Sequence, residues 1–169
     1  KNIMSRFQRL VRDVSNTLGK TINFTIEGDE TELDKNIIES LTDPLMHILR
    51  NSLDHGIESA ADRVQKGKSP EGSILFKAFY SGASVHIQIK DDGKGINAET
   101  IREKAISKGL ISEDNNLSEK ETFDLVFSPG FSTAAEVTDV SGRGVGMDVV
   151  KRNIEDLRGE VEIQSVVNQ

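Results

Sequence analysis

The chain has 169 residues, of which 28 are acidic and 21 are basic, so its formal net charge is −7. This acidic balance, without a stretch rich in lysine and arginine, disfavours a general binder of nucleic acid or anionic membranes, although backbone amides and a metal ion could still hold a nucleotide locally. The absence of cysteine excludes disulfide scaffolds, thiolate zinc sites and cysteine nucleophiles.

The length suits one domain, which we expect to span residues 1–169. No apolar run approaches the ~20 residues of a membrane-spanning helix, and no signal peptide is visible. We therefore expect a cytoplasmic, soluble domain. Because the chain begins at Lys1 rather than Met, we expect it to be a fragment of a longer protein.

Helical and strand-like patterns alternate along the chain. Helices are predicted over residues 3–18, 33–56, 98–108, 119–127 and 145–157. Strands are predicted over residues 21–27, 74–80, 85–90 and 161–165. The second helix should be interrupted near Pro44, where Thr42 or Asp43 can cap a new helix. The strands on either side of Ser81-Gly82 should form an antiparallel hairpin, whereas residues 128–143 should form a mobile loop. Helices mixed with antiparallel strands predict an α+β fold in two layers.

Residues 44–56, PLMHILRNSLDHG, predict an amphipathic helix with an unusual polar face. One face is apolar, and the other carries His47, Arg50, Asn51, Asp54 and His55. These residue types coordinate metals, bind phosphate and move protons, whereas a solvated face usually carries lysine and glutamate. From this helix alone, an ordinary surface helix with a varied polar face is an equally open interpretation.

Two glycine-rich segments follow. Residues 91–96, DDGKGI, come after the hairpin, and their glycines permit positive φ and close approach of the backbone to a ligand. An aspartate at such a turn could accept a hydrogen bond from an amino group such as that of adenine. Residues 141–147, SGRGVGM, open a helix whose N-terminal amides suit phosphate. A capped strand-to-helix turn and a flexible hinge are the plainer interpretations of the two segments. The Rossmann, P-loop and Ser/Thr/Tyr kinase patterns are absent.

Taken together, HILRNSLDHGIE, DDGKGI, FSPGFST and SGRGVGMDVVK stand in the order and spacing of four sequence boxes of the CheA-type chemotaxis histidine kinases. They resemble the N box, the first glycine box, the F box and the second glycine box of the catalytic domain. The similarity runs from SRFQRLVRD near the start to the end of the chain. The wider superfamily includes other histidine kinases, Hsp90, gyrase and MutL. The resemblance implies a Bergerat-type ATP site in a two-layer α/β sandwich, with helices over one face of a mixed, mostly antiparallel sheet.

The resemblance also assigns roles to residues. His47, Arg50 and Asn51 would be catalytic, Asn51 would help hold Mg²⁺ against the phosphates of ATP, and Asp91 would read the adenine amino group. The other nucleotide-binding residues are expected at the phosphate end of the helix, in the first glycine box and in a lid over the triphosphate: Asp54, His55, Gly93, Lys94, Gly95, Ile96, Phe131, Ser132, Thr133, Ser141, Gly142, Arg143, Gly144, Val145, Gly146 and Met147.

The implied reaction transfers the γ-phosphoryl group of ATP to a histidine of a separate phosphoacceptor domain, in cis or in a partner subunit. The histidines of this chain do not suit that acceptor role, because His47 and His55 lie in the presumed site and His86 lies in a strand. Through the full-length two-component kinase, the implied partners are response regulators, a coupling protein and chemoreceptors, with no nucleic acid and no direct membrane insertion. The isolated domain is expected to be a monomer and the parent kinase a dimer. Because the family's sheet continues with a GT-containing strand, we expect the chain to be clipped before its last strand.

Two alternatives stay open. The first is an ATP hydrolase or conformational switch of the same fold. Such hydrolases commonly place a glutamate four residues before the asparagine, where it activates water, and His47 occupies that position here. The second is a binding module that has lost nucleotide chemistry, against which the intact Asn51, Asp91 and glycines argue.

Overall fold

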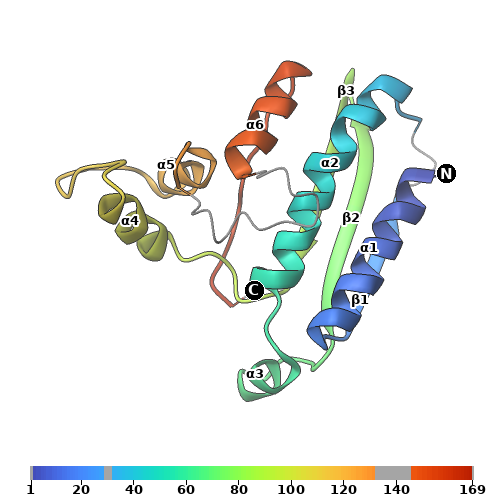
Figure 1. Ribbon diagram of the computed structural model, residues 1–169, viewed down its shortest axis with the longest axis horizontal. Helices are drawn as coiled ribbons and strands as arrows, with labels where there is room; N and C mark the ends of the chain where they lie inside the picture. The colour runs from blue at the N-terminus through green and yellow to red at the C-terminus, as the bar shows by residue number, and fades with distance from the viewer. Residues whose placement is uncertain (1, 29–31, 132–145, 169) are drawn as a thin grey trace. The chain divides into compact units, whose positions relative to one another are not determined.

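The structure, a computed structural model, describes residues 2–28, 32–131 and 146–168. They form two compact units (Figure 1). The first unit comprises residues 1–95 with 168–169, and the second comprises residues 96–167. Among the described residues, no helix is both long and apolar enough to cross a membrane.

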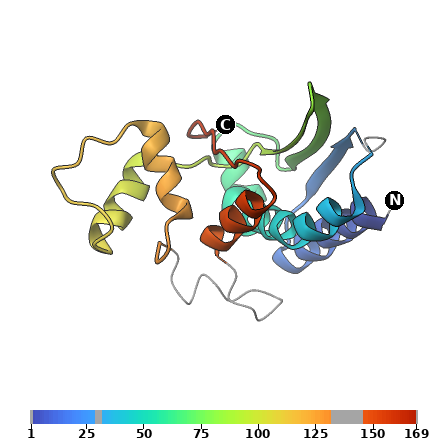
Figure 2. The same cartoon turned by 90° about the horizontal axis from the view of Figure 1, so that it is seen from above.

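The first unit is a three-stranded sheet with helices on one face. Its elements are α1 (Asn2–Leu18), β1 (Ile22–Glu27), α2 (Lys35–Asn51), the π-helix η1 (Ser52–Gly56), α3 (Ala60–Gln65), β2 (Gly72–Ser81) and β3 (Ser84–Asp91). The strand order is β1-β2-β3, with β1 parallel to β2 and β2 antiparallel to β3. Helices α1 and α2 lie along the same face of the sheet (Figure 2). The predicted α+β class, with a mixed sheet and helices on one face, is confirmed.

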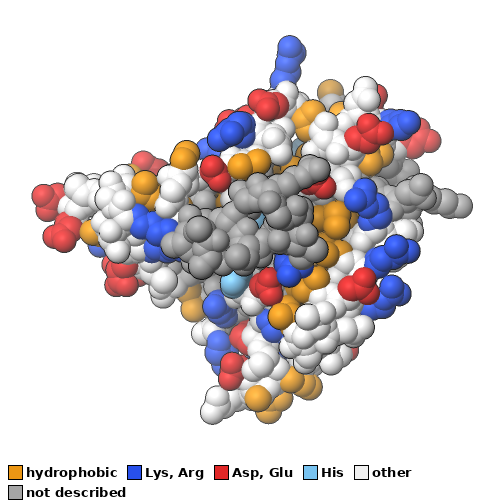
Figure 3. Space-filling view, viewed as in Figure 1, with side chains coloured by type: hydrophobic (Ala, Val, Ile, Leu, Met, Phe, Trp, Pro, Cys, Tyr) orange, Lys and Arg blue, Asp and Glu red, His pale blue; other side chains and the backbone are white. Residues whose placement is uncertain are grey.

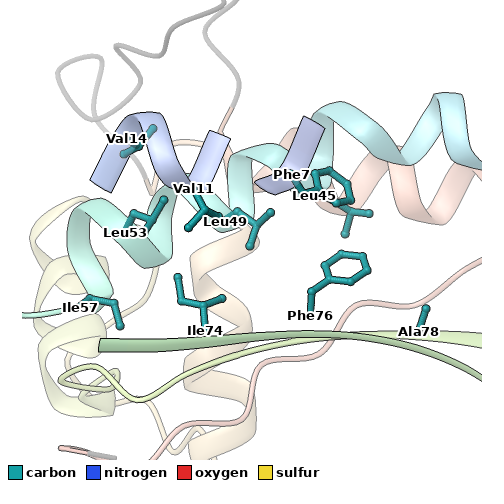
Figure 4. Close-up of a cluster of buried hydrophobic side chains, with 10 residues drawn as sticks. All are labelled: Phe7, Val11, Val14, Leu45, Leu49, Leu53, Ile57, Ile74, Phe76 and Ala78. Carbon is teal, nitrogen blue, oxygen red and sulfur yellow. The ribbon is translucent and has the colours of Figure 1, made fainter. Parts of the chain in front are cut away.

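Apolar side chains from both helices and the central strand form the core of this unit (Figure 4). From Gly72 to Ala78 every second residue of β2 is buried, as the two-residue period of a strand requires. Phe76 of β2 packs against Phe7 of α1 with ring centroids 5.1 Å apart. The buried hydrophobic residues of the cluster are Phe7, Val11, Val14, Leu45, Leu49, Leu53, Ile57, Ile74, Phe76 and Ala78. The core therefore fixes which side of α2 faces the sheet.

Helix α2 runs from Lys35 to Asn51 without a break, so the predicted interruption near Pro44 was wrong. Asp34 caps the helix, because its side chain accepts a hydrogen bond from the Asn36 N–H at 2.8 Å. An interior proline removes one helical hydrogen bond and crowds the preceding turn. Pro44 is itself buried beside Leu45, and this packing against the core offsets the lost bond.

The second unit is smaller and helical. It contains α4 (Ala98–Ser107), α5 (Glu119–Asp124), the 3₁₀ turn η2 (Leu125–Phe127) and α6 (Met147–Asp156). One cluster of its buried hydrophobic residues consists of Ile101, Ala105, Phe123 and Phe131. The side chains of Asn97 and Ser118 cap α4 and α5, and Ser118 takes part in a capping box. The predicted helices of this region are confirmed.

The strand predicted over residues 161–165 is wrong, because these residues pair with no strand of the described chain. Ser165 instead accepts a hydrogen bond at its Oγ from the Ile96 N–H at 2.8 Å. The alternation of apolar and polar residues that predicted a strand reflects one half-buried side of an extended segment: Val161, Ile163 and Ser165 are half-buried, and the residues between them are exposed. The loop predicted over 128–143 lies largely outside the described residues.

Candidate functional site

The polar side chains of residues 44–56 project from the side of α2 and η1 that faces away from the core. Leu45, Leu49 and Leu53 are buried, whereas the polar set is half-buried or exposed: His47, Arg50, Asn51, Asp54 and His55. Arg50 Nε lies 3.5 Å from Asp54 Oδ2, one helical turn apart. The visible surface of the described residues carries acidic and basic side chains interspersed (Figure 3).

The helix changes to π geometry over Ser52–Gly56, and the Ile57 N–H donates to the Ser52 carbonyl at 2.8 Å. Such single π turns occur frequently at functional sites. Lys20, which precedes β1, donates from Nζ to the carbonyls of Leu53 and Ile57 at 2.6 and 2.7 Å. Carbonyls at the end of a helix lack partners and carry partial negative charge, so the ammonium both satisfies and stabilises them. Burial lowers the pKa of Lys20, against the nearby Asp54 carboxylate, which raises it. The sequence around Lys20 contains no signal for this contact.

The loop that follows β3 meets the end of this polar helix. Asp91 Oδ1 accepts a hydrogen bond from the Gly93 N–H at 2.9 Å, and the Lys94 N–H donates to the Gly56 carbonyl, also at 2.9 Å. A Cβ on Gly93 would lie 2.0 Å from the Gly56 oxygen, and a Cβ on Gly56 would lie 3.3 Å from Asp91 Oδ2. The two segments can therefore touch because neither Gly56 nor Gly93 has a side chain. Gly95 has φ +74°, a left-handed conformation that glycine tolerates.

Gly93 was expected to make room for a nucleotide. The structure gives it a second reason to lack a side chain, because the backbone of Gly56 occupies the space on its Cβ side. Lys94 is exposed, and its carbonyl accepts the Asn168 N–H at 2.7 Å. Within the first unit, then, the structure brings Asp91, Gly93 and Lys94 together with the end of the helix that bears the predicted catalytic residues. Their roles toward a nucleotide stay predictions.

The two adjacent aspartates of this loop have different surroundings. Asp92 Oδ1 accepts from the Ser73 N–H at 2.8 Å, and its Oδ2 lies 2.9 Å from Nη2 of Arg63. The Asp92 N–H donates in turn to the Ser73 carbonyl at 3.2 Å. These bonds tie Asp92 to β2 and α3. Asp91 is half-buried, and its carboxylate accepts a bond from within its own loop. The carboxylate of Asp92 is therefore held by β2 and α3, whereas that of Asp91 accepts its bond from Gly93 in its own segment.

A buried group of charges lies beside this loop, and the sequence analysis missed it. Arg63 of α3 is 1% exposed and pairs with Glu58, whose Oε1 lies 3.1 Å from Nη1. Lys66 and Lys68 also face Glu58, at 3.5 and 2.9 Å from its Oε2. Burial alone would raise the pKa of Glu58, but its backbone hydrogen bond, the Lys68 hydrogen bond and the charges of Lys68 and Arg63 lower it to about 2. We call these four residues the Glu58 cluster.

Only part of the predicted lid is described, and it belongs to the second unit. Phe131 is buried, and Nζ of Lys104 lies 4.7 Å from its ring centroid. Gly146 precedes α6, which begins at Met147 as the glycine-rich pattern predicted. The Ile96 N–H is used by Ser165. The remaining predicted lid residues lie outside the described chain: Ser132, Thr133, Ser141, Gly142, Arg143, Gly144 and Val145.

Named relatives match almost the entire chain. The chemotaxis protein CheA of Borreliella burgdorferi is 53% identical over 166 residues, which are 98% of this chain and 19% of that protein. CheA of Salmonella typhimurium is 52% identical over 163 residues, 96% of this chain and 24% of that protein. The sensor histidine kinase CheAY of Helicobacter pylori is 53% identical over 167 residues, 98% of this chain and 21% of that protein. The chain thus spans about a fifth to a quarter of the length of these relatives.

A solved histidine kinase domain from the blue-light activated kinase of Erythrobacter litoralis EL346 superposes with a TM-score of 0.42 at 16% identity, over 73% of this chain and 53% of that one. The family described as histidine kinase-, DNA gyrase B-, and HSP90-like ATPase matches residues 40–169, well over half of the chain. The chain therefore belongs to the histidine kinase-, DNA gyrase B-, and HSP90-like ATPase family, and within it resembles the CheA proteins.

Proposed function

We propose that the chain is the ATP-binding catalytic domain of a CheA-type chemotaxis histidine kinase, which transfers the γ-phosphoryl group of ATP to a histidine on a separate phosphoacceptor domain. The observation that supports this most is the junction at Gly56, where the loop bearing Asp91 touches the end of the polar helix bearing His47 and Asn51. The carboxylate proposed to read the base and the helix proposed to face the phosphates would thereby belong to one unit. The similarity to CheA proteins over nearly the whole chain supports the same reading.

Asp91 is suited to recognise the adenine base. An ionised carboxylate has about four lone-pair sites, so the hydrogen bond from Gly93 orients it and leaves capacity for another donor. The exocyclic amino group of adenine is such a donor. Because Asp91 is half-buried, a hydrogen bond there would form partly out of water, where it discriminates more strongly between bases.

The donor chemistry of α2 fits a magnesium ion that is held jointly with the nucleotide. Mg²⁺ prefers oxygen ligands and usually binds through one or two protein groups together with phosphates and water. Among the described residues, no three His, Asp or Glu side chains form a metal-binding group, so a fully protein-made cage is not built there. The Asn51 amide oxygen would be the protein ligand, and the bound ion would neutralise charge on the phosphates.

The remaining chemistry needs little from the protein beyond position. Phosphoryl transfer depends mainly on in-line placement and charge neutralisation, and a neutral imidazole acceptor already has a free lone pair. His47 would orient the acceptor or take its proton. Arg50, which lies 3.5 Å from Asp54, would face the phosphates. His86 is exposed on β3 and stacks on Phe79 with centroids 5.2 Å apart, away from the junction, so the acceptor would come from another domain.

In the parent kinase, which we propose to be a cytoplasmic dimer, the phosphoryl group would pass to response regulators. A coupling protein and chemoreceptors would control the transfer. The chain by itself would act as a monomer. These partners follow from the resemblance to CheA proteins alone.

The test follows the label from γ-labelled ATP, with Mg²⁺, this chain and a separately expressed CheA phosphoacceptor domain. We expect label on an acceptor histidine that is lost in acid and stable in base. Asn51→Ala should abolish transfer with near-native far-UV circular dichroism, and His86→Ala is the matched histidine control that should leave transfer intact. Transfer by Asn51→Ala would remove the metal-holding role. Steady release of phosphate without a labelled acceptor would favour the hydrolase alternative.

A further inference from the structure

Lys68 makes contacts that reach beyond the ion pair with Glu58. Its ammonium donates to Glu58 Oε2 at 2.9 Å, to the Asp92 carbonyl at 3.0 Å and to the Gly93 carbonyl at 2.8 Å. A lysine ammonium has three donors, so all of them are engaged. The side chain is 16% exposed, and a cation held this far from water is costly unless each of its donors is satisfied.

The other members of the Glu58 cluster hold this ammonium in place. Glu58, whose side chain is 4% exposed, accepts from both Lys68 and Arg63. Arg63 also donates to the Asp92 carbonyl at 3.1 Å and to the Ser69 carbonyl at 2.7 Å. The backbone N–H of Lys68 donates to the Arg63 carbonyl at 2.8 Å. Lys68 and Arg63 therefore both bind the Asp92 carbonyl, and both are held in place by their bonds to Glu58.

That carbonyl belongs to the peptide unit that orients Asp91. The Asp92 C=O and the Gly93 N–H are the two ends of one planar peptide group. Lys68 and Arg63 bind its oxygen, and its N–H donates to Asp91 Oδ1 at 2.9 Å. Fixing the oxygen fixes the direction of the N–H, because the group rotates as a plate. The Asp91 carboxylate is thus aimed by cations that do not touch it.

We infer that Lys68 is a positioning residue that sets the preference of the site for adenine over bases without a 6-amino group, by holding the Asp92–Gly93 peptide that orients Asp91. This inference rests on the proposed function. The charge of Lys68 acts on the loop backbone. Its removal leaves the Asp92 carbonyl bound by Arg63 alone and takes the Lys68 bond from the Gly93 carbonyl, so the peptide group is held less firmly. The carboxylate then loses its fixed direction, while the phosphate end of the site keeps its own residues.

The test compares the dissociation constants of ATP and ITP, whose base has an oxygen in place of the 6-amino group, by calorimetry with Mg²⁺ on the 169-residue chain. Lys68→Met should lower the preference for ATP over ITP by about tenfold, which is the size expected for the loss of one hydrogen bond. Lys66→Met is the matched control, because Lys66 faces the same Glu58 oxygen at 3.5 Å from a side chain that is 39% exposed. It should keep the wild-type preference. Lys68→Arg should restore part of it.

A merely structural role for Lys68 would lower stability and weaken both nucleotides equally, so an unchanged ratio in Lys68→Met overturns the inference. An equal loss of preference in Lys66→Met overturns it too, because charge near Glu58 would then be the cause. If circular dichroism shows that Lys68→Met is unfolded, the ratio of the ATP and ITP dissociation constants is measured for Lys68→Gln instead. An unchanged ratio in that variant also overturns the inference. A wild-type chain that binds no ATP refutes the proposed function itself and the inference with it.

Discussion

Gly93→Ala is expected to be among the costliest single-methyl additions in the first unit. The new Cβ would lie 2.0 Å from the oxygen and 2.4 Å from the carbonyl carbon of Gly56, and 2.9 Å from Asp91 Oδ1. Non-bonded carbon and oxygen atoms rest at about 3.3 Å or more, so the two backbone segments must separate by about 1 Å. No side-chain rotation relieves the clash, because the two nearest atoms are backbone atoms.

That separation breaks the bond from the Lys94 N–H to the Gly56 carbonyl, which is 2.9 Å long. Overpacking costs about 1–3 kcal/mol, and the lost hydrogen bond adds about 1 kcal/mol. We expect Gly93→Ala to lower the free energy of unfolding by about 2–4 kcal/mol. The assay is urea unfolding followed by circular dichroism.

Gly82→Ala is the control. Gly82 lies in the turn between β2 and β3 with φ +61° and nothing within 4 Å of an added Cβ. It should therefore cost only the strain of a left-handed alanine, about 1 kcal/mol. Equal costs for the two variants would show that the contact between Gly56 and Gly93 has room for a methyl group, and would refute the reasoning.

Three further outcomes are expected from the same unfolding assay. Burial raises the pKa of Glu58, but its backbone hydrogen bond, its bond from Lys68 and the charges of Lys68 and Arg63 lower it to about 2. This carboxylate therefore stabilises the fold above its ordinary pKa of 4.5 and loses that effect as the pH falls toward 2. Glu58→Gln should therefore lose less stability than the wild type between pH 5 and pH 3, and parallel curves would contradict the assignment. Phe76→Ala should cost about 3–5 kcal/mol, because the ring is 2% exposed and leaves a cavity; a cost below 1 kcal/mol would place the ring outside the core. Ser118→Ala removes a capping box and should cost about 1 kcal/mol in the second unit, with faster amide exchange in the first turn of α5; unchanged exchange would contradict the capping role.

The spacing of apolar residues predicted most of the helices and strands. A helix with one buried face carries an apolar residue at every third or fourth position. The polar face of α2 was predicted in the same way. Leu45, Leu49 and Leu53 mark the buried face of the helix, so His47 and Asn51 lie on the other face. Asp91 was singled out by the resemblance to the CheA-type kinases, since the sequence itself offers two adjacent aspartates before the glycines. The structure adds a contrast that the sequence could not show, because the carboxylate of Asp92 is bonded to Ser73 of β2 and to Arg63.

What escaped prediction depends on contacts between distant segments. The helix continues through Pro44 because core packing outweighs one missing bond, and propensity alone cannot weigh that balance. Helix α3 has only six residues, too few to show a period, and its key residue, Arg63, is a buried charge that composition would place on the surface. Residues 161–165 alternate like a strand but pair with no strand of the described chain. Alternation of apolar and polar residues shows only that one side of an extended segment is half-buried, and it does not show that the segment belongs to a sheet.

The parallel pairing of β1 with β2 has a consequence for the order in which the molecule assembles. Ile22 pairs with Gly72, whereas the hairpin of β2 and β3 closes locally from Ser81 and Ser84. Local hairpins form in microseconds. A long crossover must first close a large chain loop, which costs entropy, before the paired strands can stabilise the fold. Helix α2, with His47 and Asn51, lies inside that crossover. On a ribosome, β1 would wait unpaired until the whole polar helix and β2 had emerged, so the residues proposed for catalysis would be placed only as the sheet itself is completed.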